Sequence, residues 1–355
     1  MKIIHTSDLH LESAMTSLSH YKVRERKNEL YEALVRMVDE AARLSARLII
    51  IAGDLFDVKS ISKKAAERVA NLIESHIDID FLYLPGNHDR DGFIAKLSNM
   101  PKNLFVFGRE WTYFDYGNVT VAGRSELSAD MFSELKLDGG RKNIVVLHGA
   151  VGEYAGGADS ISLSAARGLG IDYMALGHYH SYMKYDIDRR GVAVFSGTPE
   201  GRGFDEAGEC GFVILETDGE GISHRFCPCA KRTVQIIKVD ISGATRQYDI
   251  DERCEAALRG VSSLDLVRIV LTGEREMELI PDLAALERRY AYRYYVFSVK
   301  DETKMRIDPD AFARDKSLKG EFIRLVIAKE GLSEDMKDKI IKLGIATLLG
   351  EETEI

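Results

Sequence analysis

Residues 46–57 read ARLIIIAGDLFD, an apolar run that stops at a glycine and two aspartates, Asp54 and Asp57. A short run of large and β-branched residues with this ending is typical of a strand buried on both faces. Four other apolar runs also end at Asp, Asn or His: residues 1–10 (MKIIHTSDLH), 80–89 (DFLYLPGNHD), 142–150 (KNIVVLHGA) and 172–180 (DYMALGHYH). The pattern therefore predicts buried strands that carry polar side chains at their carboxyl ends.

Helical patterns lie between these strands and are clearest in residues 27–46 and 62–76. Alternating strands and helices favour a layered α/β core, in which functional sites gather at the carboxyl ends of the strands. Shorter strand candidates joined by turns follow from about residue 104, so we expect two sheets with helices outside them. The predicted fold class is an α/β two-sheet sandwich flanked by helices.

A change of pattern near residue 230 predicts a domain boundary. We expect residues 1–230 to form the domain that bears the site, residues 231–305 a small α/β cap domain, and residues 306–355 a C-terminal helical segment. In the last part, helical patterns cover residues 308–315, 318–330 and 333–352.

The composition is that of an ordinary globular protein, with 45% hydrophobic and 30% charged residues among 355. A net charge of −9 argues against a protein that coats nucleic acid by bulk charge. It does not exclude a nuclease, because bound metal ions reverse the local charge of their carboxylate ligands. Four cysteines form no disulfide framework for this length, no apolar run reaches a membrane span, and the first residues do not resemble a signal peptide. We therefore expect a cytoplasmic location.

The polar side chains at the strand ends have the composition of a metal centre. Together they offer four imidazoles, two carboxylates and one amide oxygen: Asp8, His10, Asp54, Asn87, His148, His178 and His180. This set is large enough for two ions, and its mixture of nitrogen and oxygen donors suits Mn²⁺, Fe or Zn²⁺ rather than Mg²⁺ or Ca²⁺. One histidine at a strand end is more often structural than a ligand, whereas the joint set favours metal binding.

Five motifs of this chain resemble, in order, those of the calcineurin-like metallophosphoesterases: Asp8-x-His10, Gly53-Asp54-x-x-Asp57, Gly86-Asn87-His88-Asp89, His148-Gly149 and Gly177-His178-x-His180. Within that superfamily the stretches HTSDLHLES, AGDLFD and LPGNHD, and the order of domains, are similar to the SbcD-type nuclease subunits of DNA repair. Leu11-Glu12-Ser13 follows the first motif where many of these nucleases carry Gly, which indicates a divergent branch.

The resemblance implies a role for each motif residue. One ion would be held by Asp8, His10, Asp54 and His180, and the other by Asp54, Asn87, His148 and His178, with Asp54 bridging both. Two such ions, with Mn²⁺ favoured over Fe or Zn²⁺, would clamp a phosphodiester and activate water for in-line attack.

Other residues near the motifs receive supporting roles. His88 would stabilise charge in the transition state or protonate the leaving oxygen, and Asp89 would orient His88. Asp57 would support the ligands from behind, although Asp57 and Asp89 are as well explained as turn caps. Arg90 and Arg202 are candidate phosphate contacts.

Two further segments have a functional and a structural interpretation. Lys22, Arg24, Arg26 and Lys27 form either an edge that contacts DNA phosphates or a solvated start of a helix. Residues 336–348 carry two apolar stripes: Met336, Ile340 and Leu343, and Ile341, Ile345 and Leu348. The resemblance implies that this helix docks onto the coiled coil of an SbcC-like ATPase, and packing on the chain's own body is the alternative. Residues 62–76 are a candidate homodimer surface.

The sequence thus predicts a two-metal phosphodiesterase, a Mn²⁺-dependent DNA exonuclease or endonuclease that acts with an SbcC-like ATPase in DNA repair. One alternative is a phosphodiesterase or phosphatase for small nucleotides or other phosphate esters. Another is a catalytically idle scaffold that binds DNA ends or the ATPase.

Overall fold

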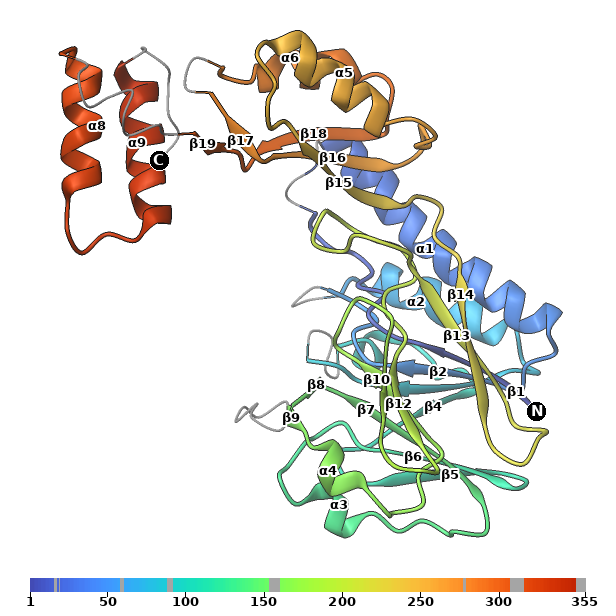
Figure 1. Cartoon of the computed structure of the whole chain (residues 1–355). Coiled ribbons are helices and arrows are strands. Elements are labelled where there is room, and N and C mark those ends of the chain that lie inside the picture. The colour runs from blue at the N-terminus through green and yellow to red at the C-terminus, as the bar shows by residue number, and fades with distance from the viewer. Residues whose placement is uncertain are drawn as a thin grey trace. The chain divides into compact units, whose positions relative to one another are not determined.

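A computed structural model describes residues 1–355 apart from 16–17, 19, 58–60, 88–91, 153–159, 277–278, 307–315 and 349–355. The chain forms two compact units, Met1–Val234 and Gln235–Ile355 (Figure 1). Among the described residues, no helix combines the length and apolarity that a membrane crossing requires. The division into three domains predicted from the sequence stays a prediction.

Two six-stranded sheets form the first unit, which agrees with the predicted fold class. The first sheet has the order β14-β13-β1-β2-β3-β4. Its strands are β1 (Lys2–Thr6), β2 (Leu48–Ala52), β3 (Asp80–Leu84), β4 (Leu104–Val106), β13 (Gly211–Glu216) and β14 (Ser223–Pro228). Strands β1 to β4 run parallel, and β13 and β14 pair antiparallel at one edge.

The second sheet has the order β11-β12-β10-β7-β6-β5. Its strands are β5 (Thr112–Tyr116), β6 (Val119–Gly123), β7 (Lys142–His148), β10 (Tyr173–Gly177), β11 (Met183–Asp186) and β12 (Val192–Phe195). Strands β6, β7, β10 and β12 run parallel, while β5 and β11 close the edges antiparallel. A short pair, β8 (Ala150–Val151) and β9 (Ser160–Ile161), follows β7.

The apolar run at residues 48–52 is buried on both faces because it lies between two cores. Leu48 and Ile50 point toward the second sheet and share one core with Ile144 and Val146 of its strand β7. Ile49 and Ile51 point to the other side and pack against the helices α1 (His20–Arg43) and α2 (Lys63–Glu74). This alternation explains why the strand shows no polar face in the sequence.

Helices cover the outer face of each sheet. The amphipathic helices α1 and α2 cover the first sheet, and α2 begins at Ser62, whose hydroxyl accepts a hydrogen bond from the Ala65 N–H. A 3₁₀ turn, η1 (Ile94–Lys96), follows β3, and the short helices α3 (Met131–Glu134) and α4 (Leu163–Ala166) lie over the second sheet. Among the described residues, these helices and the facing sheet bury the central strands on both faces, so the ends of these strands are where a site is expected.

The second unit contains a three-stranded sheet in the order β15-β16-β18 and four described helices. The strands β15 (Val234–Asp240), β16 (Leu266–Thr272) and β18 (Val296–Asp301) pack with the helices α5 (Gln247–Ala257) and α6 (Leu283–Tyr290) around one apolar core. A short pair, β17 (Glu274–Arg275) and β19 (Lys304–Met305), precedes the helices α8 (Leu318–Ala328) and α9 (Glu334–Leu348). The helix predicted at residues 308–315 lies outside the described residues.

The two apolar stripes predicted on α9 have different surroundings. Ile341 and Ile345 are buried against Ile323 of α8 and Met305 of β19. Met336 and Leu343 are 47% and 44% exposed. The side chain of Leu348 is not among those described. Ile341 and Ile345 thus pack on the chain itself, as the structural alternative predicts, whereas Met336 and Leu343 of the other stripe are exposed and its Ile340 is half-buried.

Candidate metal centre

The predicted ligand segments meet where the central strands of both sheets end. Asp8 follows β1, Asp54 follows β2, His148 is the last residue of β7, and His178 follows β10. Backbone hydrogen bonds continue beyond the strands: the Asp8 N–H donates to the Gly53 carbonyl at 3.0 Å, and the His10 N–H to the Asp54 carbonyl at 3.0 Å. The loops that carry the candidate ligands are therefore fixed to one another and not only to their own strands.

Four of these residues have an unusual backbone conformation. The φ angles of Asp8, His10, Asp54 and His178 are 52°, 46°, 52° and 115°, in a region that residues other than glycine rarely adopt. Each such residue costs about 1–3 kcal/mol, and such strain persists where the surrounding structure enforces it, often at functional sites. The His178 N–H offsets part of this cost by donating to both carboxylate oxygens of Asp8, at 3.1 and 3.0 Å.

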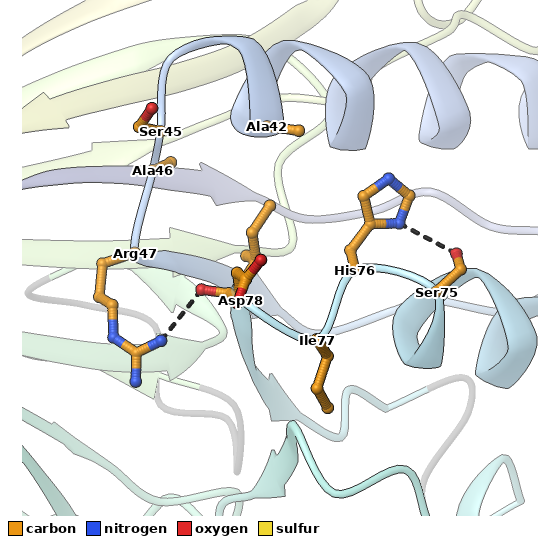
Figure 2. A pocket seen from close by; sticks show the side chains of 9 residues that line it. Ala42, Ser45, Ala46, Arg47, Ser75, His76, Ile77 and Asp78 are labelled. Carbon is orange, nitrogen blue, oxygen red and sulfur yellow. Dashed lines mark hydrogen bonds between the residues drawn. The ribbon is translucent and has the colours of Figure 1, made fainter.

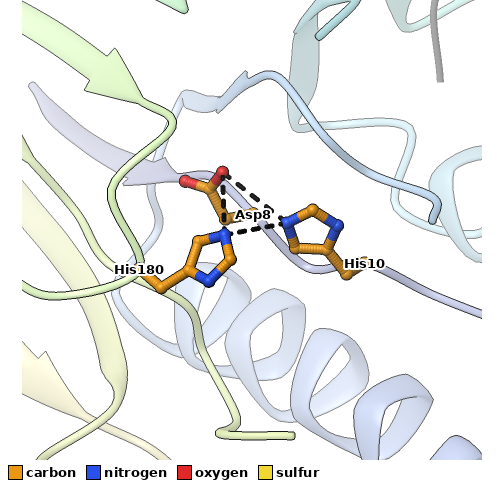
Figure 3. A group of neighbouring side chains, drawn as sticks. All are labelled: Asp8, His10 and His180. Atoms are coloured by element: carbon orange, nitrogen blue, oxygen red, sulfur yellow. Dashed lines mark hydrogen bonds and ion pairs between the residues drawn. The ribbon is translucent and has the colours of Figure 1, made fainter. Parts of the chain in front are cut away.

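One group of candidate ligands consists of Asp8, His10 and His180 (Figure 3). The Nε2 atoms of the two imidazoles are 3.1 Å apart, and Asp8 Oδ1 lies 3.8 and 3.9 Å from them. Two nitrogens that each lie about 2.1 Å from one ion, at angles between roughly 90° and 109°, are roughly 3.0–3.4 Å apart. The facing imidazoles therefore fit a shared divalent ion.

A second group consists of Asp8, Asp54 and His148. His148 Nδ1 lies 2.9 Å from the Ala52 carbonyl, which can only accept, so Nδ1 carries a proton. Its Nε2 atom faces Asp54 Oδ2 at 3.3 Å and the side-chain oxygen of Asn87 at 2.9 Å. With Nδ1 protonated, a neutral imidazole would turn the lone pair of Nε2 toward these oxygens, which repel it. The arrangement therefore requires a proton on Nε2 or a metal ion beside it.

The pKa values of His148 and His10, one histidine from each group, are shifted in opposite directions. Burial opposes protonation of His148, but the hydrogen bond to Asp54 and the nearby Asp8 carboxylate raise the pKa of His148 to about 9. Burial and the charge of Arg202 lower the pKa of His10 to about 3, so its imidazole is neutral, as a metal ligand must be. Burial raises the pKa of Asp8, although Ser7 donates a hydrogen bond to it at 2.5 Å.

The close approach of these loops depends on two glycines. A side-chain carbon on Gly53, which has a φ of 94°, would lie 2.1 Å from His148 Nδ1. One on Gly86 would lie 2.1 Å from Asp54 Oδ1. Only glycine allows the backbone to come this close to the candidate ligands.

Not every predicted site residue joins these groups. His178 lies in neither group, although its ring makes an edge contact with His148 at a centroid distance of 5.5 Å. Asp8 belongs to both groups, an arrangement that the resemblance did not imply. His88, Asp89 and Arg90 lie outside the described residues, so their roles stay predictions.

Sequence reasoning missed Glu206, which is 2% exposed and lies behind His180. Its Oε1 atom is 2.7 Å from His180 Nδ1 and 2.5 Å from Arg202 Nη2. Burial opposes the ionisation of Glu206, but these hydrogen bonds lower its pKa to about 2. Arg202 also pairs with Asp57 at 2.9 Å, so the candidate phosphate contact takes part in internal ion pairs. No motif marks Glu206: Arg202 lies four residues before it, but His180, whose ring it contacts, comes from another segment of the chain.

The basic segment at the start of α1 does not form one phosphate-binding edge. Arg26 is fully buried, forms ion pairs with Glu29 and with Glu200, the latter at 2.9 Å, and donates to the Gly201 carbonyl. The interpretation that Arg26 contacts DNA phosphates is therefore wrong, because solvent and DNA cannot reach its guanidinium.

A separate pocket lies at the opposite, amino-terminal ends of the strands (Figure 2). There the Arg47 guanidinium donates to the Asp78 carbonyl at 3.0 Å, and Ser75 Oγ lies 3.1 Å from His76 Nδ1. Since these polar groups bond to one another and to the backbone, we assign no chemistry to this pocket.

Comparisons with known proteins show which proteins this chain resembles. The sequence profile of the calcineurin-like phosphoesterases matches residues 1–182. The DNA double-strand break repair protein Mre11 of Saccharolobus solfataricus is 27% identical over 386 aligned positions, which cover 97% of this chain and 94% of the relative. The uncharacterized metallophosphoesterase YhaO of Bacillus subtilis is 26% identical, over 77% of this chain and 72% of its own. A dimetal phosphatase from Danio rerio superposes with a TM-score of 0.44 at 10% identity, over 63% of this chain and 95% of its own.

Proposed function

Because the chain belongs to the calcineurin-like phosphoesterase family, whose profile matches just over half of it, we propose that it is a two-metal phosphodiesterase that cuts DNA. Membership of the family makes it a metal-dependent phosphoesterase. The choice of DNA as substrate, of Mn²⁺ as the metal and of the partners below is the proposal.

One observation carries the proposal: ligand atoms of Asp8, His10 and His180, and of Asp8, Asp54 and His148, lie within 4.8 Å of one another in each group. These residues come from the ends of four strands in two sheets, β1, β2, β7 and β10. The mixed imidazole and carboxylate donors favour Mn²⁺, with Fe or Zn²⁺ as alternatives.

Two divalent ions bound here would polarise a phosphodiester and activate water for attack on phosphorus. The chain's own part is to hold the ligand atoms in place. The Ala52 carbonyl fixes the ring of His148, and the His178 N–H and Ser7 fix the carboxylate of Asp8. Asp54, a member of the second group, is proposed to bridge both ions. We also assign Asn87 and His178 to the second ion, and His88, oriented by Asp89, to the leaving oxygen.

The preference for DNA rests on the relatives. A protein named for DNA double-strand break repair aligns with nearly the whole chain, including the second unit. We extend the proposal to an SbcC-like ATPase as partner, which the exposed apolar residues of α8 and α9 support, and to a homodimer. The free state of all four cysteines supports a reducing, cytoplasmic location.

The test is a cleavage assay on labelled linear duplex DNA with Mn²⁺ or EDTA, beside a panel of nucleotides. The wild type should cut DNA only with Mn²⁺, and Asp54→Asn and His88→Ala should abolish cutting. Asp186→Asn, at an exposed carboxylate outside the site, is the matched control and should cut like the wild type.

Each rival predicts a different result. Cleavage of nucleotides with intact DNA would favour an enzyme for small phosphate esters. Unchanged DNA processing in His88→Ala would favour a scaffold without catalysis. Either result would refute the nuclease proposal.

A further inference from the structure

We propose that Glu206 is a positioning residue that sets the orientation of His180 and, through Arg202 and Asp57, that of His10, for binding one of the two ions. The inference rests on the proposed metal centre. It adds Glu206 and Arg202, which belong to none of the five motifs, behind that centre and links them to Asp57 of the second motif.

The contact between Glu206 and His180 determines which nitrogen of the ring faces the site. Glu206 Oε1 lies 2.7 Å from His180 Nδ1, and a carboxylate can only accept a hydrogen bond. Arg202 Nη2 also approaches Nδ1, at 3.4 Å, but the nearer carboxylate requires the proton to reside on Nδ1. The lone pair is then on Nε2, which faces Asp8 and His10.

Within its own group of candidate ligands, His180 is the residue that most needs this support. Its side chain is 29% exposed, whereas those of Asp8 and His10 are 0% and 2% exposed. A half-buried imidazole can turn about its Cβ–Cγ bond and present the wrong nitrogen. The buried Glu206 carboxylate removes that freedom, as carboxylates do behind metal-binding histidines.

Glu206 is itself held in place from two directions. The Arg202 guanidinium donates to Oε1 through Nε at 2.9 Å and through Nη2 at 2.5 Å, and the Arg202 backbone N–H donates to Oε2 at 2.5 Å. The residues just before Arg202 are also fixed, because the buried Arg26 donates hydrogen bonds to the Glu200 carboxylate and to the Gly201 carbonyl. Burial of an ionised carboxylate is thus compensated by a fixed cation.

The chain of charges continues to the second imidazole of the same group. Arg202 Nη1 donates to Asp57 Oδ2 at 2.9 Å, and Ser13 Oγ donates to the same oxygen at 2.8 Å. The other oxygen of Asp57 lies 4.0 Å from His10 Nδ1. Negative, positive and negative groups therefore alternate from His180 to His10, and both imidazoles have a carboxylate behind the nitrogen that does not face the site.

His148, in the other group, does not depend on this chain of charges. Its Nδ1 is fixed by the Ala52 carbonyl, on a different strand. Loss of Glu206 should therefore weaken the binding of one ion and spare the other, which a general loss of stability would not do.

Calorimetric titration of the full chain with Mn²⁺ tests the inference, together with thermal unfolding of the metal-free protein. Glu206→Ala should bind one of two ions about 10–100-fold more weakly and the other as the wild type does. Glu206→Gln keeps an acceptor oxygen of the same reach and should recover affinity to within about threefold of the wild type. Glu209→Ala, at an exposed residue of the same loop, is the matched control and should bind both ions normally.

Glu206→Asp covers the case in which the alanine variant does not fold. It keeps the charge for Arg202 but withdraws the oxygen from His180, so it should show the same weakening at a single site. The inference would be overturned if Glu206→Ala or Glu206→Asp bound both ions with wild-type affinity. It would also be overturned if the variant bound both ions more weakly by the same factor. A wild type that binds two ions but leaves DNA intact would refute only the nuclease proposal, and one that binds fewer than two would refute both.

Discussion

Replacement of Gly86 by alanine should disable metal binding through a single added carbon. That carbon would lie 2.1 Å from Asp54 Oδ1, 2.4 Å from the Asp54 backbone nitrogen and 2.8 Å from Asp54 Cγ. Carbon and oxygen atoms in contact rest roughly 3.3 Å apart, so the Asp54 carboxylate or the loop must move by about 1 Å. The backbone of Gly86 is not left-handed, and alanine therefore adds this clash without backbone strain.

A displacement of about 1 Å at a reacting group costs about 100-fold in function, which corresponds to about 2.8 kcal/mol. We expect Gly86→Ala to bind Mn²⁺ about 100-fold more weakly at the ion shared by Asp8, Asp54 and His148. Titration calorimetry measures the affinity, and thermal unfolding in EDTA shows whether the fold is kept. Gly221→Ala is the control, because nothing lies within 4 Å of its added carbon. Two ions bound with wild-type affinity by Gly86→Ala would refute the geometry described here.

Three further predictions concern stability. Burial opposes the ionisation of Glu29, but ion pairs with Arg232 and Arg26 lower its pKa from 4.5 to about 2. Its stabilising contribution, up to about 3 kcal/mol, is therefore complete above pH 4.5 and is lost as the pH falls from 4.5 toward 2. Guanidinium unfolding should show that the free energy of unfolding changes less with pH between 4.5 and 2 in Glu29→Gln than in the wild type. Identical pH profiles of the two proteins would contradict this. Saturating Mn²⁺ at a hundred times Kd should add about 2.7 kcal/mol per site, seen as a higher Tm that EDTA reverses; an unchanged Tm would argue against binding to the folded state alone. Ile323→Ala should loosen the contact between α8 and α9 by about 2–4 kcal/mol, with faster hydrogen exchange there and unchanged Mn²⁺ binding; equal protection in both proteins would show that this contact does not hold the helices.

The central strands and the place of the site were predictable because their signals are local. A run such as residues 48–52 has no polar face, so it must lie between two layers, and the polar residue that follows it must lie at the end of the sheet. The start of α1 was less clear. The helical pattern was clearest only from residue 27, because the first turns of α1 carry few apolar residues, whereas the helix begins at His20. The alternative that residues 22–27 start a helix is confirmed, although Arg26 in this segment is buried and not solvated.

Residues whose roles depend on distant partners were not predictable. Arg26 looks like a surface cation in its basic segment, yet its partners Glu200 and Gly201 come from a loop more than 170 positions away, and these contacts bury it. Glu206 has no motif around it, and only the folded loop brings it behind His180. Asp8 takes part in both ligand groups because its loop is bonded to the loops of Asp54 and His178, which no spacing along the chain reveals.

Anomalous diffraction from crystals of the full chain grown with Mn²⁺ tests the central claim most directly. We predict two manganese peaks, one bordered by Asp8, His10 and His180 and the other by Asp8, Asp54 and His148. Crystals with Mn²⁺ in the solution and no peak among these side chains, or with peaks only elsewhere, would show that the strand ends do not form a metal centre.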